Sequence, residues 1–481
     1  MDTKPEQKHS TIDDLIKSRL DKLKELRKGK VDPYPAKVAD LYCLQRAKDE
    51  YEELVIADAK IVVAGRIMAL RTHGGASFLD IVDESGKLQL LFKKDDLKTY
   101  DEIRLLDLGD FIEAEGHLFK TRTEEITLVV KKYRLLTKAL RPLPEAHFGL
   151  SDIETRYRER YVDLVVNPEV KNIFYKRSAI ISTLRSELVK KGFLEVDTPV
   201  LQPLAGGATA KPFATHYNAY DREVFLRIAP ELYHKRLVVG GFERVFEFAR
   251  CFRNEGVDAT HNPEFTNLEF YWAYADYEKL MDLVEEMIRE VVKNVNNGKL
   301  IFERDGKKFA FSKKFARETF HKLTDGKNTD EAFKEGQKKI VQPTFIIHHP
   351  VDISPLAKKL DEKTTQRFQL LIDGREFANA FSELNDPIDQ RQRFEKQMKL
   401  RARGDEEAQA MDEDFVKALE YGMPPTAGCG IGIDRLVMFL TGSNTLREVL
   451  LFPYMRPLEA GKVTATDQSH KSEQDQRGSV E

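Results

Sequence analysis

The chain has 481 residues, of which 41% are hydrophobic and 33% are charged, and its formal net charge at pH 7 is −3. This length predicts two or more domains, and the composition is typical of a soluble globular protein. No apolar run approaches the ~18 residues of a membrane span, so we expect no contact with a membrane. The small net charge gives no general sign of nucleic-acid binding, so any basic surface must be local.

The first residues are polar and charged and lack the apolar stretch of a signal peptide, which favours a cytoplasmic location. The three cysteines, Cys43, Cys251 and Cys429, are far apart and form no Cys-x-x-Cys pair. We therefore expect reduced thiols, no disulfide framework and no zinc site.

Residues 1–58 predict an N-terminal helical extension. Its first helix carries an apolar stripe that includes Leu23 and Leu26, and Gly29 and Pro33 end it. Basic side chains surround the stripe: Lys17, Arg19, Lys22, Lys24, Arg27 and Lys28. An RNA contact and a solvated helix packed on its own domain are both consistent with this pattern.

Residues 59–140 predict a small β-barrel. Five short strands with Gly-rich turns are expected over 61–67, 77–82, 88–92, 110–116 and 126–130. A helical stretch between the third and fourth strands suits an OB-fold, whose open face binds single-stranded nucleic acid by stacking and edge hydrogen bonds. A generic five-stranded barrel with a protein partner is the alternative.

The remaining chain predicts a linker and a larger domain. A Pro-bearing linker is expected over 141–158, a second domain over 159–458 and a disordered polar tail over 459–481. Within the second domain, about 275–340 is expected to be an insertion with a helix and a hairpin around Asp305-Gly306.

Residues 245–272 predict two apolar strands paired around a polar loop. Because side chains alternate across a strand, Phe265, Glu269 and Tyr271 share one face. With Arg253 they offer a guanidinium for phosphate or carboxylate, a ring for a base and a carboxylate for an ammonium group. Each residue alone is more often structural, but the set indicates a site for a nucleotide beside an amino acid.

Residues 367–385 predict a second hairpin, with Asp373-Gly374 as its two-residue turn. In that register Gln369 faces Ala378 and is a diagonal neighbour of Glu376 on one face. Gln369 and Glu376 could therefore share a metal ion.

Asn379, Phe381 and Glu383 alternate onto one face, but strict alternation puts Glu376 on the opposite face. We therefore expect a local bulge, or separate roles. A buried carboxylate without a cation costs several kcal/mol, so Glu383 favours a cationic substrate. An internal cation is the alternative, and three could supply it: Lys235, Arg250 or Arg375.

Three segments carry a resemblance to a known family. Residues 253–271 resemble motif 2 of class II aminoacyl-tRNA synthetases, in the form found in lysyl-tRNA synthetases of the bacterial type (subclass IIb). Residues 195–201 resemble motif 1, through which these enzymes dimerise, with Pro199 at the motif's proline. Residues 427–440 resemble motif 3, and their spacing does not match the G-x-G-x-x-G of a Rossmann fold. The resemblance covers nearly the whole chain.

The resemblance implies an α+β fold in which an OB-fold barrel precedes a catalytic domain, built on an antiparallel β-sheet flanked by helices. It implies a homodimeric lysine–tRNA ligase that uses ATP and Mg²⁺. Such an enzyme converts L-lysine to lysyl-adenylate and transfers the lysyl group to the 3′-terminal ribose of tRNA(Lys).

The resemblance also implies roles for individual residues. Arg253 and Arg435 would be catalytic, on the α-phosphate and the γ-phosphate. The implied ATP contacts are Arg253, Glu255, His261, Asn262, Phe265, Glu376 and Arg435. The implied lysine contacts are Gly207, Glu231, Arg253, Glu269, Tyr271, Asn379, Phe381 and Glu383. For Glu231, an ordinary carboxylate at a helix N-terminus is the alternative.

Mg²⁺ would be held by Glu376 and by position 369, where this chain has Gln369 and the family has Glu; Glu383 is a weaker candidate. An amide oxygen can bind Mg²⁺ but removes one negative charge, so metal number or affinity is in question. In the barrel, four residues match positions that read the central uridine of the anticodon: Arg66, Phe78, Gln89 and Glu125.

Three alternatives remain at this point. An aspartyl- or asparaginyl-tRNA synthetase should present a cation to the substrate side chain in place of Glu383. A nonenzymatic relative that binds RNA or a partner has Gln369 as its only support. A protein-modifying lysylase usually lacks the N-terminal barrel.

Overall fold

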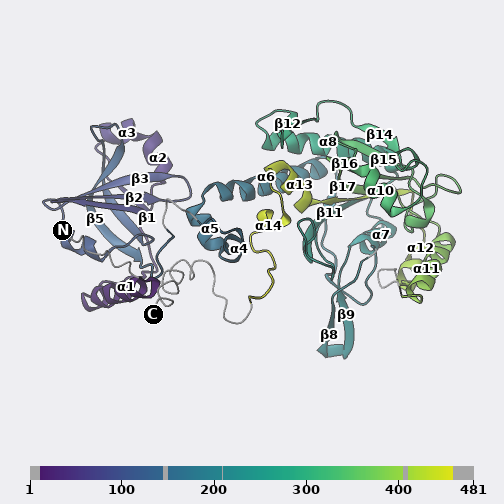
Figure 1. The fold of residues 1–481 in the computed structure, drawn as a ribbon, viewed down its shortest axis with the longest axis horizontal. Coiled ribbons are helices and arrows are strands. Elements are labelled where there is room, and N and C mark those ends of the chain that lie inside the picture. Colours follow the sequence, from purple (N-terminus) through teal and green to yellow (C-terminus); the bar gives the residue numbers. More distant parts are fainter. Residues whose placement is uncertain (1–10, 145–149, 209, 405–409, 459–481) are drawn as a thin grey trace, which may run out of the picture. The chain divides into compact units, whose positions relative to one another are not determined.

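The computed structural model describes residues 11–144, 150–208, 210–404 and 410–458 (Figure 1). The chain forms two compact units, which divide near Arg156. The expected tail over 459–481 lies outside the described residues. Among the helices of the described ranges, none combines the length and apolar character that crossing a bilayer requires.

The N-terminal unit contains the expected five-stranded barrel. Its strands are β1 (Ile61–His73), β2 (Ala76–Val82), β3 (Lys87–Lys93), β4 (Phe111–Lys120) and β5 (Ile126–Thr137). They close in the order β1-β2-β3-β5-β4, and a short 3₁₀ helix (Tyr100–Leu105) lies between β3 and β4. Alternate residues such as Ile61, Val63 and Ile67 are buried, because one face of each strand lines the barrel core.

Three helices precede the barrel: α1 (Ile12–Lys28), α2 (Leu44–Asp49) and α3 (Tyr51–Ile56). Thr11 caps α1 with a capping box, and Leu23 and Leu26 are buried. Arg19 is also buried and donates hydrogen bonds of 3.0 Å to the carbonyl oxygens of Ala139 and Arg141. This face of α1 therefore packs on its own domain, as one of the two interpretations predicted.

A wholly buried lysine links the end of β5 to the segment before β4. Lys138 Nζ lies 2.8 Å from Asp110 Oδ2 and 2.5 Å from Asp107 Oδ2, and it donates to the Leu105 carbonyl at 2.8 Å. The ammonium group is thus surrounded by oxygen acceptors, which a buried charge requires.

The C-terminal unit is built on an eight-stranded sheet in the order β14-β15-β16-β17-β18-β11-β10-β6. Its strands are β6 (Leu194–Glu195), β10 (Arg244–Phe252), β11 (Glu264–Ala273), β14 (Ala316–Thr319), β15 (Thr344–Ile347), β16 (Arg367–Ile372), β17 (Arg375–Ser382) and β18 (Thr426–Gly432). Neighbours pair antiparallel except at the two edges, where β14 and β6 run parallel to β15 and β10. The expected antiparallel catalytic sheet is confirmed.

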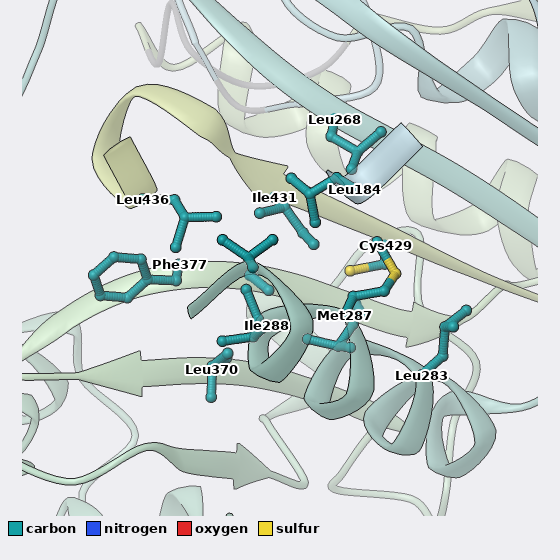
Figure 2. Packing of buried hydrophobic residues seen from close by; sticks show 14 of the residues in the cluster. Leu184, Leu268, Leu283, Met287, Ile288, Leu370, Phe377, Cys429, Ile431 and Leu436 are labelled. Atoms are coloured by element: carbon teal, nitrogen blue, oxygen red, sulfur yellow. The ribbon is translucent and has the colours of Figure 1, made fainter. Parts of the chain in front are cut away.

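Three helices cover the apolar face of this sheet: α6 (Glu169–Lys190), α8 (Tyr277–Val295) and α13 (Ile433–Thr441). Figure 2 shows Ile288 of α8 beside Leu370 of the sheet, and Met287 of α8 beside Cys429. Burial of such side chains contributes about 1.5–3 kcal/mol each, so this layer supplies much of the unit's stability.

The opposite face carries both a smaller apolar cluster and the polar residues. Helices α7 (Glu231–Val239), α11 (Pro387–Arg401) and α12 (Glu413–Glu420) lie there. Along β11, Leu268 and Phe270 point into the main core, whereas Tyr271 belongs to the cluster on this second face. The alternation of the strand therefore separates core from site.

The segment over 275–340 is integrated into the fold. The expected hairpin forms as β12 (Ile301–Arg304) and β13 (Lys307–Ala310) around Asp305-Gly306, both with positive φ. However, α8 packs in the main core and β14 joins the sheet. The other elements here are α9 (Phe320–Leu323) and α10 (Asp330–Gln337).

The remaining α-helices and strands are α4 (Ile153–Arg158), α5 (Arg160–Val166), β7 (Leu201–Gln202), β8 (Ala214–Tyr217), β9 (Arg222–Leu226) and α14 (Leu446–Val449). Only 194–195 and 201–202 are strands within motif 1, and Pro199 lies between them. β6 belongs to the eight-stranded sheet and β7 to a separate three-stranded sheet with β9 and β8, so Pro199 stands in the connection between two sheets.

A β-bulge shapes the β16–β17 hairpin. Leu371 pairs with Glu376 as expected, but Gln369 pairs with Asn379, so the predicted pairing of Gln369 with Ala378 is wrong. The register shifts because β17 contains one extra residue next to Ala378. The expected bulge is confirmed, and it brings Glu376 and Asn379 onto the same face.

Candidate active site

A cavity of about 230 Å³ lies on the polar face of the C-terminal sheet. The residues expected at ATP and lysine all line it: Gly207, Glu231, Arg253, Glu255, His261, Asn262, Phe265, Glu269, Tyr271, Glu376, Asn379, Phe381, Glu383 and Arg435. They come from loops, from helices α7 and α13, and from strands β11 and β17, which are far apart in sequence. Gln369 is not among the lining residues.

The floor of the cavity is a strand of glycines. On β18, Gly428 lies between Tyr271 of β11 and Phe381 of β17 in the hydrogen-bonded register. A Cβ atom on Gly428 would overlap the Tyr271 ring and the Glu383 carboxylate. Glycine is therefore required here for close approach, and the neighbouring side chains can lean across the strand.

Glu269 is one of three carboxylates at one end of the cavity, and it is buried. It accepts hydrogen bonds from Asn267 Nδ2 at 2.9 Å and from the Tyr271 hydroxyl at 3.1 Å. Burial, together with the nearby charge of Glu231, raises the pKa of Glu269 to about 8. Without a bound cation, Glu269 is therefore mostly protonated at pH 7.

Glu231 and Glu383 are the other two carboxylates, and Lys235 joins them. Lys235 Nζ lies 2.7 Å from Glu231 Oε1 and 2.5 Å from Glu383 Oε2. Of the three internal cations considered from the sequence, Lys235 is thus the partner of Glu383. The carboxylate of Glu231, in the first turn of α7, is held by this lysine one turn later.

One oxygen of Glu383 remains without a donor. Glu383 is 1% exposed, and no described residue donates a hydrogen bond to its Oε1. Burial raises the pKa of Glu383 well above its ordinary value, although Lys235 opposes the shift. A buried acceptor without a donor is costly, so this end of the cavity suits a cationic ligand.

Arg253 and Phe265 lie together at the other end. The guanidinium carbon lies 5.0 Å from the centre of the Phe265 ring, in a cation–π contact. The Arg253 Nε atom is buried and has no partner among the described residues. The guanidinium group is therefore free to bind an anion, and the ring offers a surface for a base.

The loop between β10 and β11 and the start of α13 add further polar groups. His261 Nδ1 lies 2.8 Å from Asp258 Oδ2, and its Nε2 lies 3.5 Å from the Arg435 guanidinium. Asn262 Oδ1 is buried without a partner in the described part of the chain, and Glu255 is exposed. Arg435 lies in the first turn of α13, so phosphate oxygens could meet both its side chain and the helix N-terminus.

The structure separates the two residues expected to share a metal. Glu376 lines the cavity, whereas Gln369 is buried and its Oε1 lies 2.8 Å from His349 Nε2. Burial lowers the pKa of His349 well below its ordinary value, so the imidazole is neutral at pH 7. Among the described residues, no group of three or more metal-binding side chains is present.

The sequence interpretation named Lys235 only as one of three possible partners of Glu383, and it gave Asn267 and Gly428 no role in the site. Asn267 stands two residues before Glu269 on one strand face, and Lys235 stands four after Glu231 on one helix. These spacings were available signals. The role of Gly428 depends on the register of three strands, which the sequence does not contain.

Comparison with known proteins assigns the family. The model for class II tRNA synthetases (D, K and N) matches residues 152–456, and the model for an OB-fold nucleic acid binding domain matches residues 61–136. The chain is 49% identical to a lysine–tRNA ligase from Carboxydothermus hydrogenoformans, over 93% of this chain and 99% of the relative. It is 47% identical to that of Magnetococcus marinus, over 92% and 97% of the two chains.

The chain belongs to the lysine–tRNA ligase family of class II tRNA synthetases. This assignment confirms the family and the fold that the motifs indicated. Because the relatives match along almost their entire length, the resemblance includes the barrel of the synthetase as well as its catalytic sheet.

On the synthetase's barrel, three of the four expected anticodon residues share one region. Phe78 is partly exposed, and the Thr127 hydroxyl donates to Gln89 Oε1 at 2.9 Å and to the Glu125 carbonyl at 3.2 Å. Arg66 lies elsewhere: its guanidinium stacks 4.2 Å from the Phe111 ring and donates to the Gly109 carbonyl.

A role for Arg66 in anticodon reading stays a prediction, and the strand register places a different arginine opposite Phe78. Arg71, not Arg66, is directly opposite Phe78 in the β1–β2 register, and its guanidinium lies 3.1 Å from Asp80 Oδ1. A bulge between Ile67 and Ala69 shifts the register, which the sequence interpretation did not include.

Proposed function

We propose that this synthetase is a lysine–tRNA ligase, which activates L-lysine with ATP and transfers the lysyl group to the 3′-terminal ribose of tRNA(Lys). The observation that carries the substrate assignment is the buried Glu383, whose Oε1 faces a cavity and has no donor among the described residues. The curated relatives are lysine–tRNA ligases, which supports the same assignment.

In this proposal the amino acid binds at the carboxylate end. Glu383, Glu269 and Tyr271 hold the ε-ammonium group, and Glu231 with the backbone at Gly207 holds the α-ammonium group. Asn379 and Phe381 complete the walls around the side chain. Burial strengthens these charge interactions and selects against neutral and acidic side chains.

ATP binds at the arginine end. Phe265 stacks on the adenine, Arg253 bridges the α-phosphate and the lysine carboxylate, and Arg435 meets the γ-phosphate. Glu255, His261, Asn262 and Glu376 supply further contacts, and all of these residues line the cavity.

The reaction needs no nucleophilic side chain. A lysine carboxylate oxygen attacks the α-phosphorus, and the bond to the β-phosphate oxygen breaks to release pyrophosphate. The ribose hydroxyl of tRNA then attacks the lysyl carbonyl carbon, and AMP leaves. Arg253 and Arg435 contribute by positioning the reactants in line and by stabilising negative charge in the transition state.

Mg²⁺ is the implied cofactor, and Glu376 fits it as a ligand. Mg²⁺ commonly keeps several waters and binds through one or two carboxylates plus substrate phosphates, so a single protein carboxylate is sufficient. Bound to ATP, the ion would neutralise phosphate charge. Gln369 is a poor metal ligand in this arrangement, because its amide oxygen is hydrogen-bonded to His349. Glu383 is a poor ligand as well, because it forms an ion pair with Lys235.

A homodimer and a cytoplasmic site of action belong to the same proposal. Around motif 1, Leu194 and Leu201 are 50% and 52% exposed, and Pro199 is also exposed. Strand β6 is an edge of the large sheet. An apolar edge of this kind suits a partner subunit. Charging of tRNA for protein synthesis takes place in the cytoplasm.

The rival substrates are aspartate and asparagine. A site for either should direct a cation at the side chain, whereas the amino-acid end of this cavity is lined by Glu231, Glu269 and Glu383, and Lys235 lies behind two of them. The test is amino-acid-dependent ATP–pyrophosphate exchange with lysine, aspartate and asparagine, across a Mg²⁺ titration. Exchange with lysine alone is expected. Exchange with aspartate or asparagine, or none at all, would contradict the proposal.

A further inference from the structure

Lys235 is the buried cation closest to the proposed amino-acid site, yet it is not one of the residues that line the cavity. Its side chain is fully buried, and its Nζ contacts Glu231 and Glu383, which both line the cavity. The rings of Phe381 and Phe415 lie 5.6 and 5.7 Å from the Nζ atom. The ammonium group thus lies behind the cavity wall.

The charges around this lysine match a substrate with two cationic groups. Three carboxylates line this end of the cavity: Glu231, Glu269 and Glu383. Arg367 also acts on Glu231, but among the described residues Lys235 is the cation that forms ion pairs with these carboxylates. If all three are ionised, its single charge leaves two negative charges without an ion-pair partner. A substrate with an α-ammonium and a side-chain ammonium supplies two positive charges, whereas a monoamine supplies one. Because uncompensated charge is costly in a buried site, this pocket favours the substrate with two ammonium groups over the monoamine.

We propose that Lys235 is a positioning and specificity-determining residue: it holds Glu231 and Glu383 ionised and oriented, and it sets the charge of the pocket to suit a diamino acid. This inference rests on the proposed function, because it assigns a role within the lysine site. Lys235 acts through its two carboxylate partners and not by touching the substrate.

Geometry argues against a role in stability alone. Glu231 belongs to α7 and Glu383 follows β17, so one ammonium group sets the relation between two separate elements. A buried ion pair is often no more stabilising than well-packed apolar residues, so the scaffold does not require a lysine at this position. Lys138 is a buried lysine with no link to the cavity. It contacts two aspartates and a carbonyl oxygen within the N-terminal unit, whereas the cavity belongs to the C-terminal unit.

The ionisation of the three residues is coupled. Burial opposes the charge on Lys235, but Glu231 and Glu383 raise the pKa of its ammonium above the ordinary value. Burial raises the pKa of both carboxylates, and the lysine charge counters the shift. The other titratable or charged groups facing them are His234, Glu247, Glu269, Tyr271 and Arg367. Without the lysine charge, one or both carboxylates should take up a proton at neutral pH.

The test is the full-length Lys235→Met variant, assayed by lysine-dependent ATP–pyrophosphate exchange between pH 6.5 and 8.5. At pH 7 the KM for lysine should rise at least tenfold, while the KM for ATP stays within twofold of wild type. The increase should become smaller as the pH rises, because higher pH restores the carboxylate charges. A purely structural role would lower kcat and thermal stability without this pH-dependent effect on lysine.

Two further variants complete the test. Lys235→Gln keeps a hydrogen-bond donor between the carboxylates without the charge, so it should show the same lysine defect even if Lys235→Met fails to fold. Lys138→Met removes a matched buried lysine and should lower the Tm while leaving the KM for lysine unchanged.

The outcomes separate this inference from the proposed function. Wild-type exchange with aspartate or asparagine would overturn the proposed function and, with it, this inference. Wild-type exchange with lysine, together with a Lys235→Gln variant whose lysine KM and pH profile match wild type, would overturn this inference alone.

Discussion

Gly428 lies so close to Glu383 that a methyl group on the glycine would overlap the Glu383 carboxylate. Gly428→Ala should therefore displace Glu383 and the Tyr271 ring. We expect the KM for lysine in pyrophosphate exchange to rise at least about tenfold, which corresponds to about 1.4 kcal/mol of binding. Gly75→Ala is the control, since its Cβ would meet only an ordinary contact at 3.7 Å. An unchanged KM in Gly428→Ala would contradict this view of the pocket floor.

Lysine binding should strengthen as the pH rises towards 8. Burial raises the pKa of Glu269 to about 8, so without lysine the Glu269 carboxyl is mostly protonated below that pH. Binding of an ammonium group favours the carboxylate and releases the proton. Calorimetry in buffers of different ionisation enthalpy should detect proton release at pH 7 and little at pH 8.5. Glu269→Gln should abolish the Glu269 part of that release, and release equal to wild type would exclude Glu269 as its source.

The same pKa predicts a pH dependence of stability. Between the ordinary pKa of 4.5 and about 8, folded Glu269 retains a proton that the unfolded chain has lost. Stability of the unliganded protein should therefore fall as the pH rises through this window. Thermal unfolding should show that lysine raises the Tm more at pH 8 than at pH 6. A larger shift at pH 6 would have the wrong sign for this mechanism.

Removal of the Arg253 guanidinium should slow the activation step. Arg253 lies over Phe265 with its Nε unpaired among the described residues, so it is free for substrate. Arg253→Gln should lower kcat for exchange by roughly 10²–10³-fold, the scale of losing one preorganised charge-stabilising group. Arg250→Gln, near the end of β10, is a matched control, because Arg250 is exposed and its guanidinium forms a 3.5 Å ion pair with the exposed Glu264. Equal losses in both variants would argue against a catalytic role for Arg253.

Glu376 should determine the Mg²⁺ requirement. Of Glu376 and Gln369, only Glu376 lines the cavity, whereas the side-chain amide of Gln369 is hydrogen-bonded to His349. In Glu376→Gln, the Mg²⁺ concentration for half-maximal exchange should rise several-fold, because one anionic ligand is lost. Glu303→Gln, which removes an exposed carboxylate paired with Lys308, should leave it unchanged. A Mg²⁺ titration that is identical in Glu376→Gln and wild type would exclude this carboxylate as a ligand.

Phe78 should matter for tRNA and not for amino-acid activation. Base–aromatic stacking is worth about 1–3 kcal/mol, so Phe78→Ala should weaken tRNA binding by roughly five- to 150-fold. The KM for tRNA in aminoacylation measures this effect. Exchange without tRNA provides the internal control and should equal wild type, since Phe78 lies in the barrel. A normal KM for tRNA would remove Phe78 from the recognition surface.

Alternation along single strands allowed much of the site to be predicted. The expected face of Phe265, Glu269 and Tyr271 is the cavity face, because β11 is a regular strand with an unbroken register to β10. Five barrel strands were likewise predicted from local pattern and turns. Where neighbouring residues decide the structure, the sequence was sufficient.

Features that depend on distant segments were not predictable in the same way. Gln369 was expected at a metal, but β15 and the following loop bring His349 to its amide. The one-residue bulge in β1 places Arg71, in place of Leu70, opposite Phe78. The pairing of Lys235 with Glu383 requires the packing of α7 on the sheet. Each case depends on register or packing between separate elements.

The glycines of β18 also limit how the pocket can change. Gly428, Gly430 and Gly432 all line the cavity. A side chain at Gly428 would meet Glu383 and Tyr271, and one at Gly430 would meet Asn267, so substitution there adds atoms to the floor. The floor can become shallower through mutation but not deeper. A new amino-acid preference in this scaffold must therefore arise on β11, β17 or α7, which carry the walls, and β18 keeps the same depth throughout such a change.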